Sequence, residues 1–162
     1  MENRSILALE LTQLKPLIGK WNFQGSFKDN PDKWVQGWET YEVIDDGKAI
    51  LCDGETQTIL SGDTIDIYKN SMKILFKTDI KKIIGGNEWE INFDRNTLIF
   101  QNSRHRFTGN LDESKGTITG KWENIATSGK WKYWYDKTFT KTDKIKLNES
   151  KPATNKVLPQ WG

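Results

Sequence analysis

Large aromatic residues recur at every second position in short runs separated by turn residues. The clearest run is Trp89-Glu90-Ile91-Asn92-Phe93, and Trp21-Asn22-Phe23 and Trp131-Lys132-Tyr133-Trp134-Tyr135 repeat the pattern. A period of two places alternate side chains on opposite faces of a strand. With 8 Trp, 7 Phe and 4 Tyr in 162 residues, the pattern predicts a curved antiparallel sheet with an aromatic concave face.

The length and charge of the chain limit its class. A chain of 162 residues fits one domain and can bury a core without disulfides. The net charge of +2 is interspersed along the sequence. It forms no basic stripe of the kind that a nucleic-acid footprint needs, so we expect no nucleic-acid partner.

Targeting and metal signals are weak. Cys52 is the single cysteine, which fits a reducing compartment. The first ten residues are too charged for a secretory signal, and no stretch approaches the roughly 18 apolar residues of a membrane span. We therefore expect a cytoplasmic protein. One His, one Cys and scattered acids offer no metal-ligand spacing, and we predict neither a metal nor a cofactor.

The chain begins with one expected helix, over residues 5–14. Ser5 is a plausible N-cap, Leu7, Leu11 and Leu14 share a face, and Pro16 marks the end. After Pro16 the period changes to two.

The remainder of the first 141 residues reads as strands separated by turn signals every 8–12 residues. The predicted strands are 20–28, 34–44, 48–55, 57–60, 64–68, 72–77, 88–94, 97–101, 104–111, 117–124 and 130–141. Gly37 is a natural bulge position, because Trp34 and Trp38 have one parity and Tyr41 the other. Residues 142–162 lose the periodicity, and we expect an extended or disordered tail.

This pattern leaves no room for crossover helices, so the fold class is all-β. We predict a single antiparallel up-and-down barrel of about eight to ten strands, whose interior has room for one small ligand. Trp and Tyr carry polar tips that need partners, so an inward row of them suits a pocket better than a solid core. The predicted ligand-binding residues are Tyr41, Trp89, Ile91, His105, Phe107, Trp122, Trp131 and Tyr133.

Two stretches resemble known barrel proteins. Leu14-Lys15-Pro16-Leu17-Ile18-Gly19-Lys20-Trp21 is similar to the opening of lipocalin and calycin barrels, where a short helix leads into Gly-x-Trp. Residues 107–110, 116–123 and 129–131 contain Phe-x-Gly, Ile-x-Gly-x-Trp-Glu and Gly-x-Trp. They resemble the carboxy-terminal half of a bacterial lipocalin-like family of unknown function. The resemblance implies a barrel that binds a small ligand, with Trp21 at its closed end. Lipocalins often place an Arg over this Trp, where the last strand here offers Lys137 and Lys141.

Three functions remain open. The first is binding of one small, mainly hydrophobic or aromatic molecule inside the barrel by a monomer or homodimer. The second is an isomerase, cyclase or dehydratase that uses the same cavity, with His105, Tyr133 or Tyr135 transferring protons. The third is a surface site for carbohydrate or protein, built from Trp34, Trp38 and Trp134.

Overall fold

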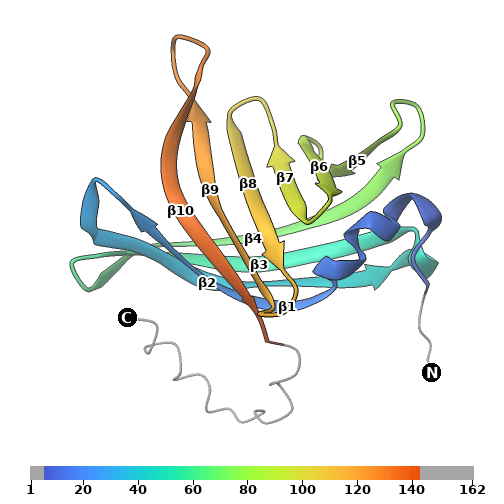
Figure 1. Cartoon of the computed structure of the whole chain (residues 1–162), viewed down its shortest axis with the longest axis horizontal. Helices are drawn as coiled ribbons and strands as arrows, with labels where there is room; N and C mark the ends of the chain where they lie inside the picture. Colours follow the sequence, from blue (N-terminus) through green and yellow to red (C-terminus); the bar gives the residue numbers. More distant parts are fainter. Residues whose placement is uncertain (1–5, 143–162) are drawn as a thin grey trace.

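Ten antiparallel strands follow one another in chain order around a closed barrel, and β10 closes it by pairing with β1 (Figure 1). This computed structural model describes residues 6–142. The predicted up-and-down barrel is confirmed. One 3-10 helix, η1, precedes the barrel, and a short turn, η2, joins β2 to β3. The elements are η1 (Leu9–Leu17), β1 (Gly19–Phe27), β2 (Asn30–Ile44), η2 (Asp45–Gly47), β3 (Ala49–Leu60), β4 (Asp63–Lys77), β5 (Lys82–Gly85), β6 (Trp89–Asp94), β7 (Thr97–Gln101), β8 (His105–Asp112), β9 (Thr117–Ile125) and β10 (Trp131–Lys141).

The helix begins later than the expected residues 5–14 and includes Pro16. Ahead of it, the Ala8 N–H donates to the carbonyl of Gly47 at 2.9 Å, which ties this segment to the η2 turn, and the helix starts at Leu9. Gly47 has φ +90°, and a Cβ there would lie 1.9 Å from the Ile6 carbonyl oxygen, so only glycine fits this contact. Ser5, the expected N-cap, lies outside the described residues, as do residues 143–162 of the expected tail.

Two pairs of predicted strands are single long strands in the structure. Residues 48–55 and 57–60 form β3, and residues 64–68 and 72–77 form β4, which runs through Asn70 and Ser71 without interruption. Backbone ladder bonds do not depend on side-chain polarity, and Asn70 and Ser71 border the interior where a polar side chain is tolerated. The short strand β5 has only four residues and left no periodic signal.

The expected bulge at Gly37 is absent, since β2 keeps its register with β1 and β3 through this residue. Trp34 and Trp38 simply face outward and Tyr41 inward along one regular strand. A side chain at Gly37 would collide with its neighbours, because a Cβ would lie 1.9 Å from the Glu55 carbonyl oxygen and 2.7 Å from Cζ of Phe23. The glycine is therefore required by packing.

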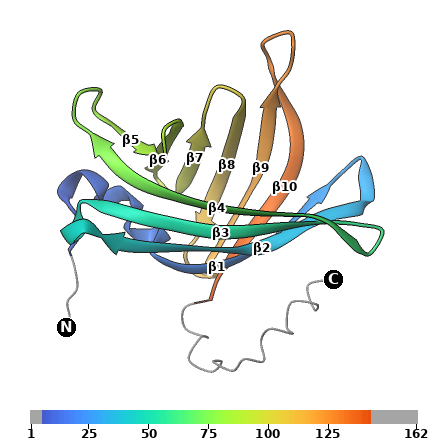
Figure 2. The same ribbon diagram turned by 180° about the vertical axis from the view of Figure 1, so that it is seen from behind.

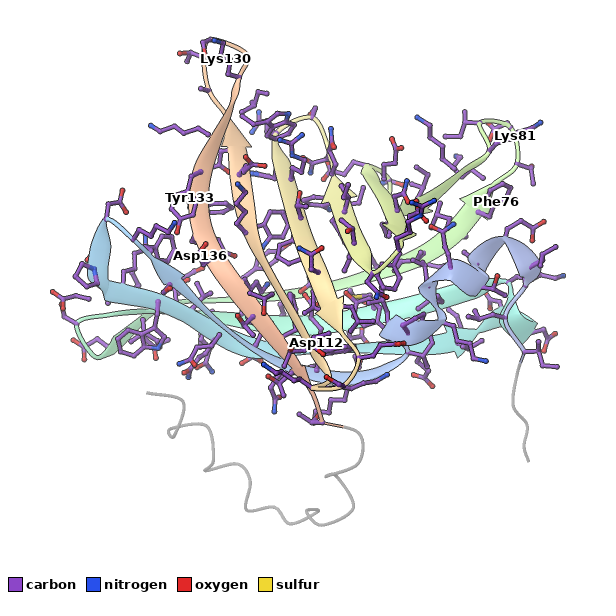
Figure 3. All side chains as sticks on the ribbon, viewed as in Figure 1. Phe76, Lys81, Asp112, Lys130, Tyr133 and Asp136 are labelled. Carbon is purple, nitrogen blue, oxygen red and sulfur yellow. The ribbon has the colours of Figure 1, made fainter. Side chains whose placement is uncertain are left out.

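The barrel interior divides into two parts along the strand direction. We call the end covered by η1 the closed end. The opposite end, which carries the β9–β10 hairpin, is the open end. Figure 2 shows η1 beside the β2–β3 turn, and Figure 3 labels Asp112 at the closed end and Lys130 at the tip of the open-end hairpin. The core at the closed end consists of buried apolar side chains: Leu11, Leu14, Leu17, Trp21, Ile50, Ile74, Ile83, Ile91, Phe93, Leu98, Phe107, Ile118 and Phe139.

Trp21 anchors the closed end and is 1% exposed. Its Nε1–H donates to the carbonyl of Leu17 at 2.9 Å, which satisfies the indole within the barrel. Lys141 occupies the place that the lipocalin resemblance gives to an Arg. Its Nζ lies 5.3 Å from the centroid of the Trp21 ring and donates to the carbonyl of Pro16 at 3.2 Å. Through Lys141, β10 thus contacts both Pro16 of η1 and Trp21 of β1; we call this pair of contacts the clamp.

Within residues 6–142, no helix has the length and apolar character needed to cross a membrane.

Candidate ligand-binding site

A cavity of about 630 Å³ lies inside the barrel toward the open end. Sites for small molecules typically have roughly 300–1,000 Å³. Four of the predicted site residues line the cavity: Tyr41, Trp89, His105 and Trp122. Its other large apolar or aromatic side chains are Phe27, Val35, Tyr68, Met72, Phe100, Trp134 and Tyr135. Its polar wall includes Lys33, Glu39, Cys52, Thr56, Thr58, Asp66, Asn70, Glu88 and Lys137.

Aromatic rings from four strands meet on one wall of the cavity. The ring of His105 is nearly parallel to those of Trp89 and Trp134, with centroid distances of 6.5 and 5.4 Å and interplanar angles of 22° and 27°. Trp122 meets Trp89 and Trp134 edge-on, at 5.7 and 6.3 Å. This arrangement gathers four aromatic rings in the wall of the cavity, which suits contact with another ring.

The orientation of His105 is fixed by Asn124, its direct cross-strand partner. Nδ1 of His105 lies 2.7 Å from Oδ1 of Asn124. Because an amide oxygen only accepts, Nδ1 carries the hydrogen in this pairing. Among residues 6–142, no group of three or more His, Cys, Asp or Glu side chains is arranged to hold a metal ion.

A bulge in β10 explains why Trp131 and Tyr133 lie outside the cavity although alternation predicted them inside. Tyr133 pairs with Glu123 and Tyr135 pairs with Trp122, so Trp134 is the extra residue. Tyr135 and Trp134 therefore both face the cavity, and Trp131 and Tyr133 switch to the outer face. The signal was present in the sequence, because three consecutive aromatics at 133–135 break the period of two.

On the outer face, Trp131 and Tyr133 contact cations. The guanidinium carbon of Arg106 lies 4.4 Å from the centroid of Trp131, and Arg106 also forms an ion pair with Glu123 at 3.0 Å. Nζ of Lys28 lies 4.9 Å from the ring centroid of Tyr133, which Figure 3 labels on β10.

Ile91 and Phe107, also predicted for the site, belong to the core and do not border the cavity. They are 3% and 2% exposed. The ring of Phe107 packs against Trp122 at 5.5 Å and Phe139 at 5.7 Å. Phe107 thus supports the wall of the cavity from the closed end.

The expected surface platform of three tryptophans does not come together. Trp34 and Trp38 lie on the outer face of β2, whereas Trp134 lines the cavity from β10.

Four residues that border the cavity form what we call its floor: Glu39, Tyr41, Cys52 and Lys137. The sequence pattern did not predict Glu39 and Lys137 for the site. The hydroxyl of Tyr41 donates to Oε1 of Glu39 at 2.9 Å. Burial raises the pKa of Tyr41 well above its ordinary value, and neighbouring Cys52 and Glu39 raise it further. Burial also raises the pKa of the Cys52 thiol, and Glu39 adds to the shift. These two groups therefore stay protonated at neutral pH.

Lys137 is the most deeply buried cation of this floor, with 5% of its surface exposed. Burial lowers the pKa of its ammonium, and the Glu39 carboxylate and Cys52 partly offset that effect. Its inward position could have been read from β10, where it has the same parity as Tyr135 and Phe139. Lysine is normally a surface residue, so the sequence pattern did not single out Lys137 as an interior side chain.

Comparison with known proteins supports the fold. Rv2717c from M. tuberculosis superposes with a TM-score of 0.52 at 9% identity, over 84% of this chain and 99% of that one. The S-type phycobiliprotein lyase CPES from Guillardia theta gives a TM-score of 0.51 at 10% identity, over 82% of this chain and 95% of that one. These likenesses support the fold of the chain, a closed antiparallel β-barrel. No protein-family model and no curated protein matches the sequence.

Proposed function

We propose that the protein binds one small, mainly apolar molecule with a planar or aromatic part inside the barrel. The observation that carries this proposal is the cavity of about 630 Å³ with its near-parallel Trp89, His105 and Trp134 rings. A planar ligand gains apolar burial and ring contacts there that water cannot supply. The filled core at the closed end holds the surrounding strands in place.

Binding explains the polar groups of the cavity better than catalysis does. Burial and Glu39 raise the pKa of Tyr135, and burial raises that of Tyr41, so both hydroxyls act as donors rather than bases at neutral pH. Tyr133, one of the proton-transfer candidates, does not border the cavity. His105 is engaged by Asn124 and by two indole rings, which gives it a defined place in the wall.

A cavity-filling variant tests the proposal. Asn70 and Lys69 are neighbours on β4, and only Asn70 borders the cavity. Asn70→Phe should place a ring in the space and weaken binding at least tenfold, whereas Lys69→Phe on the exposed outer face should leave binding unchanged. Binding would be measured by quenching of tryptophan fluorescence with fatty acids, polycyclic aromatics and tetrapyrroles, since Trp89, Trp122 and Trp134 line the cavity.

Two results would overturn the proposal: no fluorescence response to any compound of the panel, or equal binding by the two variants. Native mass spectrometry of the freshly purified protein complements the panel. A co-purified small molecule should be retained by Lys69→Phe and lost from Asn70→Phe.

A further inference from the structure

The ammonium of Lys137 borders the cavity without a hydrogen-bond partner. Its Nζ lies 3.8 Å from the ring centroid of Phe23, 4.8 Å from that of Phe139 and 5.9 Å from that of Trp122. No acceptor in residues 6–142 lies within hydrogen-bond or ion-pair distance of this nitrogen. Aromatic faces stabilise a cation, but they leave its N–H groups unpaired. The Lys137 ammonium therefore has N–H groups available on the side of the cavity.

A second donor in the same cavity wall has no acceptor either. Trp122 lines the cavity, and its Nε1–H is buried without a partner in the described part of the chain. An indole nitrogen can only donate. The Glu39 carboxylate, by contrast, already accepts a hydrogen bond from Tyr41. Both unpaired groups are donors, so the complementary ligand group is an acceptor.

The charge of the floor decides which kind of acceptor fits. Glu39 and Lys137 both border the cavity and carry opposite charges, so the floor is balanced before a ligand arrives. A carboxylate or phosphate would bring a second negative charge into a buried space that already contains Glu39. A carbonyl oxygen accepts hydrogen bonds without that additional charge.

We propose that the cavity selects ligands that carry a neutral carbonyl group, and that the ammonium of Lys137 binds this carbonyl at the floor. This inference rests on the proposed function, because it assigns one end of the ligand to Lys137 and the aromatic part to the ring wall of Trp89, His105 and Trp134. A hydrogen bond from a charged donor is among the stronger ones in proteins. Lys137 thereby sets the preference of the cavity for ligands with a carbonyl group.

Three naphthalene probes that share one ring system test the inference. They are 2-dimethylaminonaphthalene, its 6-propionyl ketone and its 6-carboxylate. The wild-type protein should bind the ketone at least about tenfold more tightly than the parent amine, which has no carbonyl, and more tightly than the carboxylate. Emission of the bound ketone should also lie further to the red than in Lys137→Met, because a hydrogen bond to the carbonyl stabilises its charge-transfer excited state.

Lys137→Met should bind the parent as the wild type does and lose the preference for the ketone. Lys132→Met is the matched control, since Lys132 is exposed on the same strand and does not border the cavity; it should keep the preference. The comparison of the three probes in the wild-type protein needs no variant and stands even if a substitution at Lys137 disturbs folding.

The outcomes separate the two proposals. If the parent binds but the ketone binds no better, or if the carboxylate binds most tightly, the assignment of Lys137 is overturned and the binding function survives. If none of the probes and no compound of the larger panel binds, the binding function itself fails.

Discussion

The two ends of this barrel are built from the same kinds of residue and differ in whether their polar atoms find partners within the protein. At the closed end, the indole of Trp21 donates to Leu17, and leucines from η1 fill the space beneath it. At the open end, the indole nitrogen of Trp122 is buried without a hydrogen-bond partner among residues 6–142. Between the two ends, the ammonium of Lys137 borders the cavity over the rings of Phe23 and Phe139. Unpaired buried donors lower stability. The closed end therefore stabilises the fold, and the open end keeps hydrogen-bonding capacity that the proposed ligand can use.

The largest expected effect compares truncations at the two ends. Leu14 of η1 is fully buried, whereas Tyr68 borders the cavity and is 61% exposed. Leu14→Ala should lower the free energy of unfolding by about 2–5 kcal/mol, and Tyr68→Ala by no more than about 0.5 kcal/mol. Urea unfolding followed by fluorescence measures both. Equal losses would contradict the division of the interior into a filled part and an open part.

The next effect concerns the cation at the boundary between the two ends. Lys137→Met should raise the free energy of unfolding of the ligand-free protein, by about 1–4 kcal/mol as for buried ionic groups replaced by apolar ones. The methionine removes a buried charge and keeps contact with Phe23 and Phe139. Chemical denaturation of the two proteins side by side gives the difference. A less stable variant would mean that Lys137 is part of the structural core.

The pH dependence of that difference has a defined sign. Burial holds the pKa of Lys137 in the folded protein below its ordinary value of 10.5. Between those two pKa values, Lys137 binds more protons in the unfolded chain than in the folded one, so its own contribution to the stability of the wild type rises with pH in this window. The advantage of Lys137→Met should therefore shrink as pH rises toward the ordinary lysine pKa of 10.5.

Other groups that face Lys137 are common to both proteins in this measurement. Glu39, Tyr41, Cys52 and Tyr135 are unchanged, and the raised pKa values of the last three lower stability at high pH in wild type and variant alike. Unfolding curves at a series of pH values give the difference directly. If the stability difference between Lys137→Met and the wild type stayed constant or widened with pH, the lowered pKa of Lys137 in the folded protein would be refuted.

The smallest effect tests the clamp at the closed end. Lys141→Met removes the hydrogen bond to Pro16 and the cation from the face of Trp21, and should lower the free energy of unfolding by about 1 kcal/mol. Lys141→Arg keeps both interactions and should stay close to the wild type. Thermal unfolding resolves the pair. If Met and Arg behave alike, the clamp contributes nothing measurable.

Much of the closed end could be predicted from the sequence, because period and apolarity coincide there. The row of Trp21 and Phe23 and the leucine face of the helix required no information beyond spacing. The open end was harder to predict. The bulge at Trp134 reverses the facing of Trp131 and Tyr133, and a period count that assumes an uninterrupted strand cannot detect it. From the sequence, a polar residue such as Asn70 is expected in a turn and one such as Lys137 at the surface. In the structure both border the cavity, where polar side chains are tolerated.

The candidate site is complete only after β10 has paired with β1, the contact that closes the barrel. Trp134, Tyr135 and Lys137 all lie on β10, and Gly25 of β1 meets Lys137 in the closing ladder. These two strands are more than 100 residues apart in sequence, so their contact is among the slowest to form. During synthesis, nine strands can pair before any complete binding site exists. Under the proposed function, ligand binding by a newly made molecule would therefore report that its barrel has closed.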